Sequence, residues 1–305
     1  MKLSKQNGIY LALVTATISG VSIYLNKFAV QAVPDAVLLT TLKNTVVGLA
    51  LVGYLILTGR RAWRSGSSGK RTTWMGLAAL SVLGGSLPFL LFFQGLASAA
   101  APSAALVHKS LFLWVALLAI PLLGERPGRW TLAGLALLTL GQLLNGWPLG
   151  WGWSSGETLI LLATWLWAAE TILARLLLPA VPTGVAAAAR MAGGAVLMWL
   201  YLVASGQAGR VVTLSFVQWG WVLLTSAFLL GYVTTWYAAL KRAPATIVTS
   251  ALTLGAVVTV ILGRLNDGLT LGADRLLGLA LMVAGVALVI HLRGDRRPRV
   301  RPAAA

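Results

Sequence analysis

The sequence has few of the groups that enzymes and metalloproteins use for chemistry. Among 305 residues there is no cysteine, and there are only two histidines and seven acidic residues. The lack of cysteine excludes disulfides, thiolate metal sites and cysteine nucleophiles. A GxxxxGK[ST] phosphate-binding loop is also missing. Intramembrane enzymes need paired acids, a histidine cluster or a Ser/His arrangement, and His108 and His291 lie far apart. We therefore expect no catalytic residue, metal or cofactor.

Charge is scarce and apolar residues are abundant. Charged residues make up 10% of the chain, against roughly 25% in a soluble domain. Hydrophobic residues make up 58%, and the mean hydropathy is +0.84. Apolar runs of about 20 residues match a hydrocarbon layer about 30 Å thick. The sequence predicts an all-α polytopic membrane protein with ten spans, at residues 8–30, 36–57, 73–95, 101–123, 129–147, 157–178, 183–204, 216–239, 245–263 and 272–292.

The net charge of +17 reflects basic loops rather than a nucleic-acid surface. With the N-terminus inside, 17 lysines and arginines flank the inner ends of the spans and three flank the outer ends. This asymmetry favours an N-in, C-in protein, and we expect it in a bacterial cytoplasmic (inner) membrane. The basic start is read as a retained first span rather than a cleaved signal peptide. The tail 293–305 is expected to be a basic cytoplasmic segment that attracts anionic lipid.

The chain matches itself weakly but in a consistent order. The offset between the two halves drifts only from 148 to 144 residues; the matches are Pro34 with Pro182, Ser22 with Glu170, Lys43 near Arg190, and Gly134–Leu137 with Gly278–Leu281. Each unit then holds five spans, at 1–147 and 148–292. An odd number of spans inverts the second copy relative to the first, an arrangement typical of transporters with a site between the halves.

Two stretches carry a family resemblance. GLASAAAPSAALVHKSLFLWVALLAIPLLGERP in the first half and YAALKRAPATIVTSALTLGAVVTVILG in the second resemble EamA-type transporters of the drug/metabolite transporter superfamily. The resemblance implies an exporter-type fold of ten helices around a central cavity, for substrates from amino acids to dyes. The chain departs from the family pattern in two places. Leu111-Phe112 and Gly255 stand where proline is frequent, and no glutamate of the second half matches Glu125.

Span one carries polar residues on one helical face. Thr15, Ser19, Ser22 and Asn26 follow a spacing of 4, 3 and 4 residues. The repeat-matched face of span six holds Ala163, Trp167, Glu170 and Ala174. Because the two faces correspond, both are expected to border one central space. The alternative for the polar face is hydrogen bonding between packed helices.

Ionisable groups inside spans are the main site candidates, because facing lipid would cost them several kcal/mol. Burial favours the neutral form of the Glu170 carboxyl and a nearby cation favours the charged form, so Glu170 could bind and release a proton. The alternative is a structural ion pair with Lys109, Lys43 or Arg190. Lys43-Asn44 and the repeat-related Arg190 are further substrate-binding candidates, whereas Lys27 and Arg175 are expected to snorkel.

Span four contains the pair His108-Lys109 in an apolar context. Lys109 is expected to contact an anion or carboxylate, or to be the partner of Glu170. His108 would contact substrate or pack as a satisfied histidine. Trp114 and Trp167 could form the floor of a pocket, or pack in the bundle. Glu157 fits a capping box with Ser154 and is expected to serve only as a helix cap.

The favoured function is a secondary transporter, working as an exporter of a small organic metabolite such as an amino acid or other carboxylate. Four intramembrane cations (Lys27, Lys43, Lys109 and Arg190) against one acid motivate the anionic substrate. The alternative is a lipid flippase or a membrane sensor of the same fold. Expected partners are the solute, membrane lipid and a coupling proton, with no nucleic acid; a monomer and a homodimer are both open.

Overall fold

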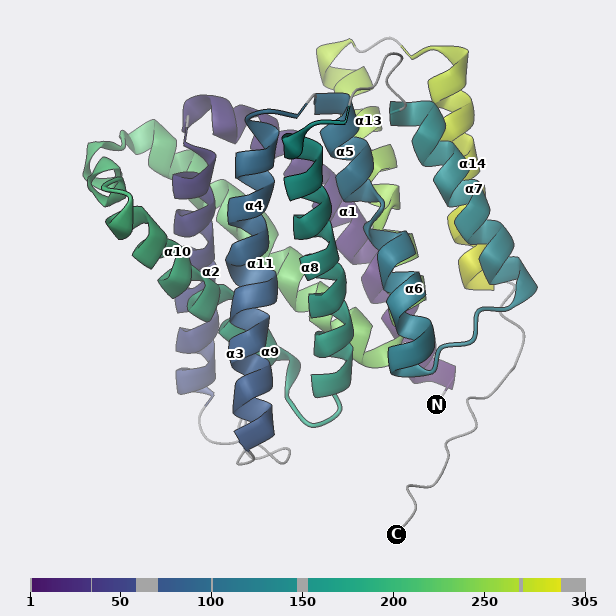
Figure 1. Ribbon diagram of the computed structural model, residues 1–305, viewed down its shortest axis with the longest axis horizontal. Helices are drawn as coiled ribbons and strands as arrows, with labels where there is room; N and C mark the ends of the chain where they lie inside the picture. Colours follow the sequence, from purple (N-terminus) through teal and green to yellow (C-terminus); the bar gives the residue numbers. More distant parts are fainter. Residues whose placement is uncertain are drawn as a thin grey trace.

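The protein is a bundle of helices that run up and down between two faces (Figure 1). The computed structural model describes residues 2–33, 35–58, 71–99, 101–146, 153–268 and 271–291. The helices of these residues are α1 (Lys2–Ala32), α2 (Ala36–Leu57), α3 (Arg71–Gly85), α4 (Leu87–Leu96), α5 (Ala101–Lys109), α6 (Leu111–Leu123), α7 (Arg129–Gly146), α8 (Ser155–Leu177), α9 (Thr183–Ala188), η2 (Ala189–Gly193), α10 (Gly194–Ala204), η3 (Ala208–Thr213), α11 (Phe216–Arg242), α12 (Ala245–Leu252), α13 (Leu254–Asp267) and α14 (Ala273–His291).

Each of the ten expected spans corresponds to one helix or to a run of two or three consecutive helical segments. In the described part of the chain, nine stretches are long and apolar enough to cross a membrane. The fifth expected span, α7, is not among the nine, but its 18 residues pack along α14. Spans three, four, seven and nine are each broken near the middle.

The helices α7 and α14 show how the two repeats relate. An added Cβ on Gly134 would lie 2.7 Å from the carbonyl oxygen of Gly285, and one on Gly141 would lie 2.6 Å from that of Gly278. In the alignment of the two repeats, Gly134 corresponds to Gly278 and Gly141 corresponds to Gly285. Gly134 thus contacts the equivalent of Gly141, and Gly141 contacts the equivalent of Gly134. Glycine permits this close approach of two helix backbones. The reciprocal contact is what two inverted copies produce.

Spans four and nine are interrupted at equivalent residues. Span four breaks at Ser110, whose hydroxyl donates to the carbonyl oxygen of Val107 at 2.6 Å. Span nine breaks at Thr253, whose hydroxyl donates to the carbonyl oxygen of Ser250 at 2.7 Å. Hydroxyls that bond back to the preceding turn compete with the helix ladder and bend the helix. Both repeats are therefore bent by a hydroxyl at this point, and neither has a proline at the position where EamA-type transporters often carry one.

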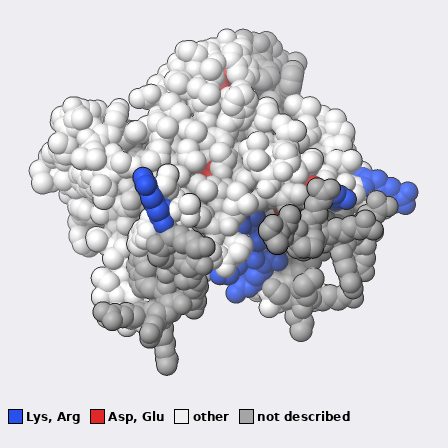
Figure 2. Space-filling view, turned by 60° about the horizontal axis from the view of Figure 1, so that its bottom comes forward, with Lys and Arg blue, Asp and Glu red and all other residues white. Residues whose placement is uncertain are grey.

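Basic side chains gather on one face of the bundle. We call it the basic face, and it carries Arg71, Arg126, Arg129, Lys241 and Arg242 at helix ends or in a connection. Helix α1 begins at this face, at the bottom of Figure 1. Figure 2, turned so that the bottom comes forward, shows blue side chains on this face and few red ones. The other end, where α1 and α4 end, is called the opposite face.

The packed core differs between the half of the bundle near the basic face and the half near the opposite face. Near the basic face, one continuous cluster of buried apolar residues joins both repeats, including Phe112 of α6, Leu178 of α8 and Leu240 of α11. Towards the opposite face, two separate clusters take its place in the described residues. One joins α1, α2, α10 and α11 around Leu39 and Leu202, and the other joins α5 and α8 around Val107 and Ile160. The apolar core is thus continuous near the basic face and divided into two clusters towards the opposite face, and each of these clusters includes helices of both repeats.

Candidate functional site

The third span is interrupted where it passes other helices of the bundle. Pro88 lies in the first turn of α4 and has no N–H, so the carbonyl of Gly84 lacks its usual helical donor. The next two amides, of Phe89 and Leu90, both donate to the carbonyl oxygen of Ser86, at 3.0 and 3.2 Å. The break at Ser86 therefore leaves the Gly84 and Gly85 carbonyls for other partners.

Side chains from three other spans bond these two carbonyls. The Arg190 Nε and the Trp167 Nε1 donate to the carbonyl oxygen of Gly84, at 3.2 and 3.4 Å. The Asn44 Nδ2 donates to the carbonyl oxygen of Gly85 at 3.0 Å. Because unpaired backbone groups are costly away from water, these side chains stabilise the break. Three predicted site residues thus meet at one point of the backbone.

Glu170 lies beside this point and is 2% exposed. Its Oε1 accepts a hydrogen bond of 2.5 Å from the hydroxyl of Tyr237 on α11, and it lies 3.8 Å from the Arg190 Nη1. Of the three cations considered as partners, the structure brings Arg190 to the carboxylate, and not Lys43 or Lys109. Glu170, Arg190 and Tyr237 form what we call the buried triad, which links three helical segments of the second repeat.

Arg190 belongs to a π-helical segment that the sequence did not reveal. Residues Ala189–Gly193 form η2, between α9 and α10. The hydroxyl of Ser81 on α3 donates to the carbonyl oxygen of Ala189 at 2.8 Å and so holds one end of the segment. Single π turns within α-helices are frequent at functional sites. Here the π-helix in span seven meets the break in span three.

The first repeat has a related polar contact nearer the opposite face. The Lys43 Nζ donates to the Asn26 Oδ1 at 2.7 Å, and the Asn26 Nδ2 donates to the Ser22 hydroxyl at 3.1 Å. All three side chains are only half-buried. Lys43 is the repeat equivalent of Arg190, so in each repeat the cation of the second span contacts a polar side chain of the first. Unlike Arg190, Lys43 has no carboxylate beside it in the described residues.

His108 and Lys109 face different surroundings. The ring centroid of His108 lies 4.9 Å from that of Trp167 and 5.0 Å from that of Phe92. The His108 Nδ1 is buried and has no hydrogen-bond partner among the described residues. Lys109, the last residue of α5, is exposed, and within the described part of the chain no acid lies in ion-pair range. His108 therefore lies in an aromatic cluster, whereas Lys109 is an exposed residue at the end of α5.

Trp114 lies apart from that cluster. Its Nε1 donates to the Ser110 hydroxyl at 2.9 Å, and its ring meets Trp165 edge to face at a centroid distance of 5.2 Å. Trp165 is exposed on the surface of the bundle. The structure thus favours the packing interpretation of Trp114, while Trp167 contacts both His108 and the backbone break.

Two glutamates tie helices together at the two faces. Glu157 completes the expected capping box with Ser154 and also accepts from the Ser103 hydroxyl of α5, so the expectation of a cap alone was wrong. Glu125, after α6, accepts from the amides of Ala245 and Thr246 at 2.7 and 3.3 Å. It thereby caps α12 of the other repeat and links the repeats at the basic face.

Arg175 was expected to snorkel at the basic face. Its side chain is only half-buried, and its Nη1 donates to the carbonyl oxygen of Lys241 at 3.2 Å. The Lys241 Nζ in turn donates to the carbonyl oxygen of Val181 at 3.3 Å. Arg175 therefore connects the ends of α8 and α11 in addition to reaching the interface.

Comparisons with known proteins agree with this architecture. The model of the EamA-like transporter family matches the chain twice, over residues 6–147 and 154–291. A solved crystal structure is similar in fold, with a TM-score of 0.72 and 18% identity over 96% of this chain and 98% of that one. A search of curated proteins gave no match. The family match over both repeats and the all-helical bundle thus define a membrane transporter of the drug/metabolite type. The chain belongs to the EamA-like transporter family.

Proposed function

We propose that the protein exports a small organic carboxylate, such as an amino acid or another metabolite acid, by alternating access. The observation that carries this proposal is the placement of two lysines, Lys43 and Lys109, in the divided half of the bundle on helices of different clusters, with no acidic partner among the described residues. The membership of a transporter family supports the class of activity.

The divided core supports a cavity that opens to the opposite face. In the basic half, a single core joins the repeats, and Glu125 links α6 to α12 across them. In the other half, the cluster around Leu39 and the cluster around Val107 are separate. Alternating access needs one face closed while the other can open, and a core that is continuous near the basic face but divided towards the opposite face supports this mechanism. With the basic face in the cytoplasm, the described arrangement would be the outward-open one.

The two lysines lie at the same depth in the divided half. Lys43 is the eighth residue of α2 and Lys109 the ninth of α5, and both helices start at the opposite face. At 1.5 Å per residue, both lie roughly 11 Å from the helix starts. Helix α2 belongs to one cluster and α5 to the other. A carboxylate between the clusters would therefore have an ammonium group available on each side.

The buried triad contributes little to this positive charge. Arg190 lies 3.8 Å from Glu170, and both side chains are at most 8% exposed. The excess of intramembrane cations then rests on Lys43 and Lys109, because Lys27 lies near the end of α1 beside the ring of Phe28. Proton binding by Glu170 during transport stays a prediction of this proposal. Transport that keeps its pH dependence in Glu170→Gln would contradict it.

Binding tests the substrate class. The purified protein is screened by thermal unfolding against small carboxylates and against neutral and cationic analogues of the same size. A bound ligand raises the unfolding temperature by mass action. We expect at least one carboxylate to stabilise the wild type and Lys27→Met, and to lose its effect in Lys109→Met and Lys43→Met. Equal shifts in all four proteins would contradict the assignment of the lysines.

A further inference from the structure

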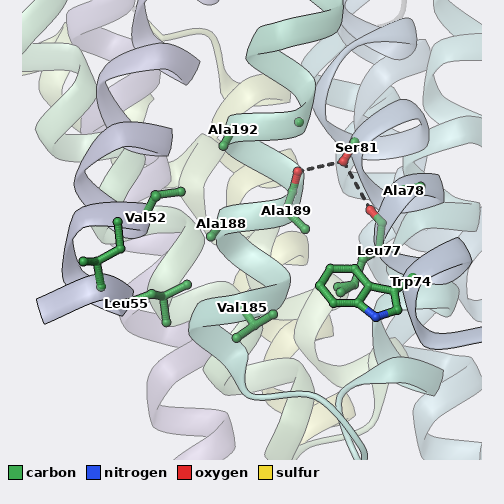
Figure 3. A pocket seen from close by; sticks show the side chains of 12 residues that line it. Val52, Leu55, Trp74, Leu77, Ala78, Ser81, Val185, Ala188, Ala189 and Ala192 are labelled. Carbon is green, nitrogen blue, oxygen red and sulfur yellow. Dashed lines mark hydrogen bonds between the residues drawn. The ribbon is translucent and has the colours of Figure 1, made fainter. Parts of the chain in front are cut away.

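An apolar hollow lies in the basic half of the bundle, away from Lys43, Lys109 and the aromatic cluster. It has a volume of about 380 Å³ and lies between α2, α3 and the α9–η2 segment (Figure 3). Leu55 of α2, Trp74 and Leu77 of α3, and Val185 and Ala188 of α9 form its walls. Figure 3 shows these side chains around the space, with the Ser81–Ala189 hydrogen bond at one end. We call it the lateral pocket.

The chemistry of the lateral pocket is almost entirely apolar. Ser81 is the only lining residue with a polar side-chain oxygen, and its hydroxyl already donates to the carbonyl oxygens of Ala189 and Leu77. Trp74 adds an indole N–H near the basic face. Such walls offer no site for a carboxylate, and an apolar cavity of this kind does not hold water well. The lateral pocket therefore suits a hydrocarbon ligand.

The lateral pocket is continuous with the surface that faces lipid. Among its lining residues, Ile56 is 72% exposed and Trp74 is 52% exposed. Both belong to segments that are long and apolar enough to cross the membrane. Acyl chains of the leaflet at the basic face are thus the apolar molecules nearest to its mouth.

Towards the membrane centre, close helix contacts surround the end of the lateral pocket. An added Cβ on Gly48 would lie 2.8 Å from the Ala192 Cα, and one on Gly85 would lie 2.8 Å from the Gly194 Cα. These contacts bring α2 and α3 against span seven just beyond the pocket. They separate the pocket from the buried triad, so it is a side site and not a stretch of a transport path.

A cation stands near the mouth of the lateral pocket. Arg71 is exposed and precedes Trp74 by one helical turn on α3. Residues three apart lie on the same helix face. A basic residue close to an interfacial tryptophan is at the depth of lipid headgroups. Positive charge there favours an anionic headgroup over a zwitterionic one.

We propose that the lateral pocket binds one acyl chain of an anionic phospholipid from the leaflet at the basic face. The lipid's chain lies between α2, α3 and α9, and its phosphate lies near Arg71. Because Ala189 and Gly193 of the π-helix line the pocket, the bound chain also packs against the segment that carries Arg190. The proposal does not depend on which solute is transported.

Photocrosslinking tests this site in the full chain. The protein is reconstituted with phosphatidylglycerol that carries a photoreactive group on one acyl chain, and the labelled peptides are identified by mass spectrometry. We expect labels within residues 52–56, 74–81 and 185–193. Ala78→Leu fills the pocket from an exposed position and should lower this labelling at least fivefold. Ala50→Leu, an equal substitution on exposed α2 surface outside the pocket, should leave it unchanged.

Headgroup preference is tested with the same reagent built on phosphatidylcholine, and with Arg71→Gln. The zwitterionic lipid should label the pocket severalfold less, and Arg71→Gln should remove that difference. Equal labelling of wild type and Ala78→Leu would overturn the proposal, as would equal labelling by the two lipids. If the protein elutes as a dimer and the pocket is not labelled, a second copy of the chain would be assigned to the pocket. This result would also overturn the proposal.

Discussion

The hydroxyl of Tyr237 lies 2.5 Å from the Glu170 Oε1, deep in the basic half of the bundle. Arg190 approaches the same oxygen at 3.8 Å from the π-helix of span seven. The carboxylate therefore has one neutral and one cationic partner from two different helical segments. An acid held in this way stabilises one arrangement of α8, α11 and η2, and the consequences can be measured.

Removal of the tyrosine hydroxyl is expected to destabilise the protein. Tyr237→Phe leaves the Glu170 oxygen without this donor, and an unmet buried hydrogen bond costs about 1–3 kcal/mol. Chemical denaturation in detergent, followed by tryptophan fluorescence, measures the loss. Tyr232→Phe on the same helix is the control, because this tyrosine stacks on Trp236 and its hydroxyl is not bonded to Glu170. Equal losses in the two variants would contradict a specific Tyr237–Glu170 bond.

The ion pair predicts a non-additive pair of substitutions. Glu170→Gln or Arg190→Met alone leaves one buried charge without its partner, which costs about 3–5 kcal/mol. The double variant removes both charges, so its loss should fall short of the sum by about 0.5–3 kcal/mol. The free energies of unfolding of the four proteins measure the coupling. Additive losses would show that the two side chains do not stabilise each other.

The link between the repeats at the basic face should control access from that side. Ser250→Cys places a single thiol at a fully buried position of α12 in a chain without other cysteines. We expect a maleimide added at the basic face to label it slowly. Glu125→Ala removes the carboxylate that caps α12 and should raise the labelling rate severalfold. Arg126→Ala, at the next and exposed residue, is the matched control. A rate unchanged by Glu125→Ala would contradict the role of Glu125 in closing this face.

The architecture was predictable because the length of the apolar runs and the internal repeat can both be read from the sequence. Apolar runs located the ten spans, and the match of Gly134 with Gly278 indicated the two repeats. The alignment of Lys43 with Arg190 identified the two cations as repeat-related, and the structure adds the contact of each with a side chain of the preceding span. These inferences depend on periodicity and order along the chain, which the fold preserves.

The details of the site were less predictable because they depend on which atoms meet in space. Three cations were possible partners of Glu170, and only the packing of α8 against η2 selects Arg190. The π-helix has no sequence signature, and Tyr237 was one aromatic residue among several. Pro88 has no N–H to donate to Gly84, but the donors that replace it come from spans six and seven. The hydrogen bonds of Glu125 to α12 likewise join residues 120 positions apart.

Carboxylate transport through a site that includes Lys109 is the central claim. Its most direct test is the uptake of radiolabelled carboxylates by proteoliposomes, with neutral and cationic analogues alongside. For the wild type and Lys27→Met, we predict uptake of at least one carboxylate above protein-free liposomes. For Lys109→Met we predict uptake at least tenfold lower, since about 1.4 kcal/mol of lost binding corresponds to this factor. Uptake of neutral or cationic solutes but of no carboxylate, or carboxylate uptake unaffected by Lys109→Met, would contradict the account.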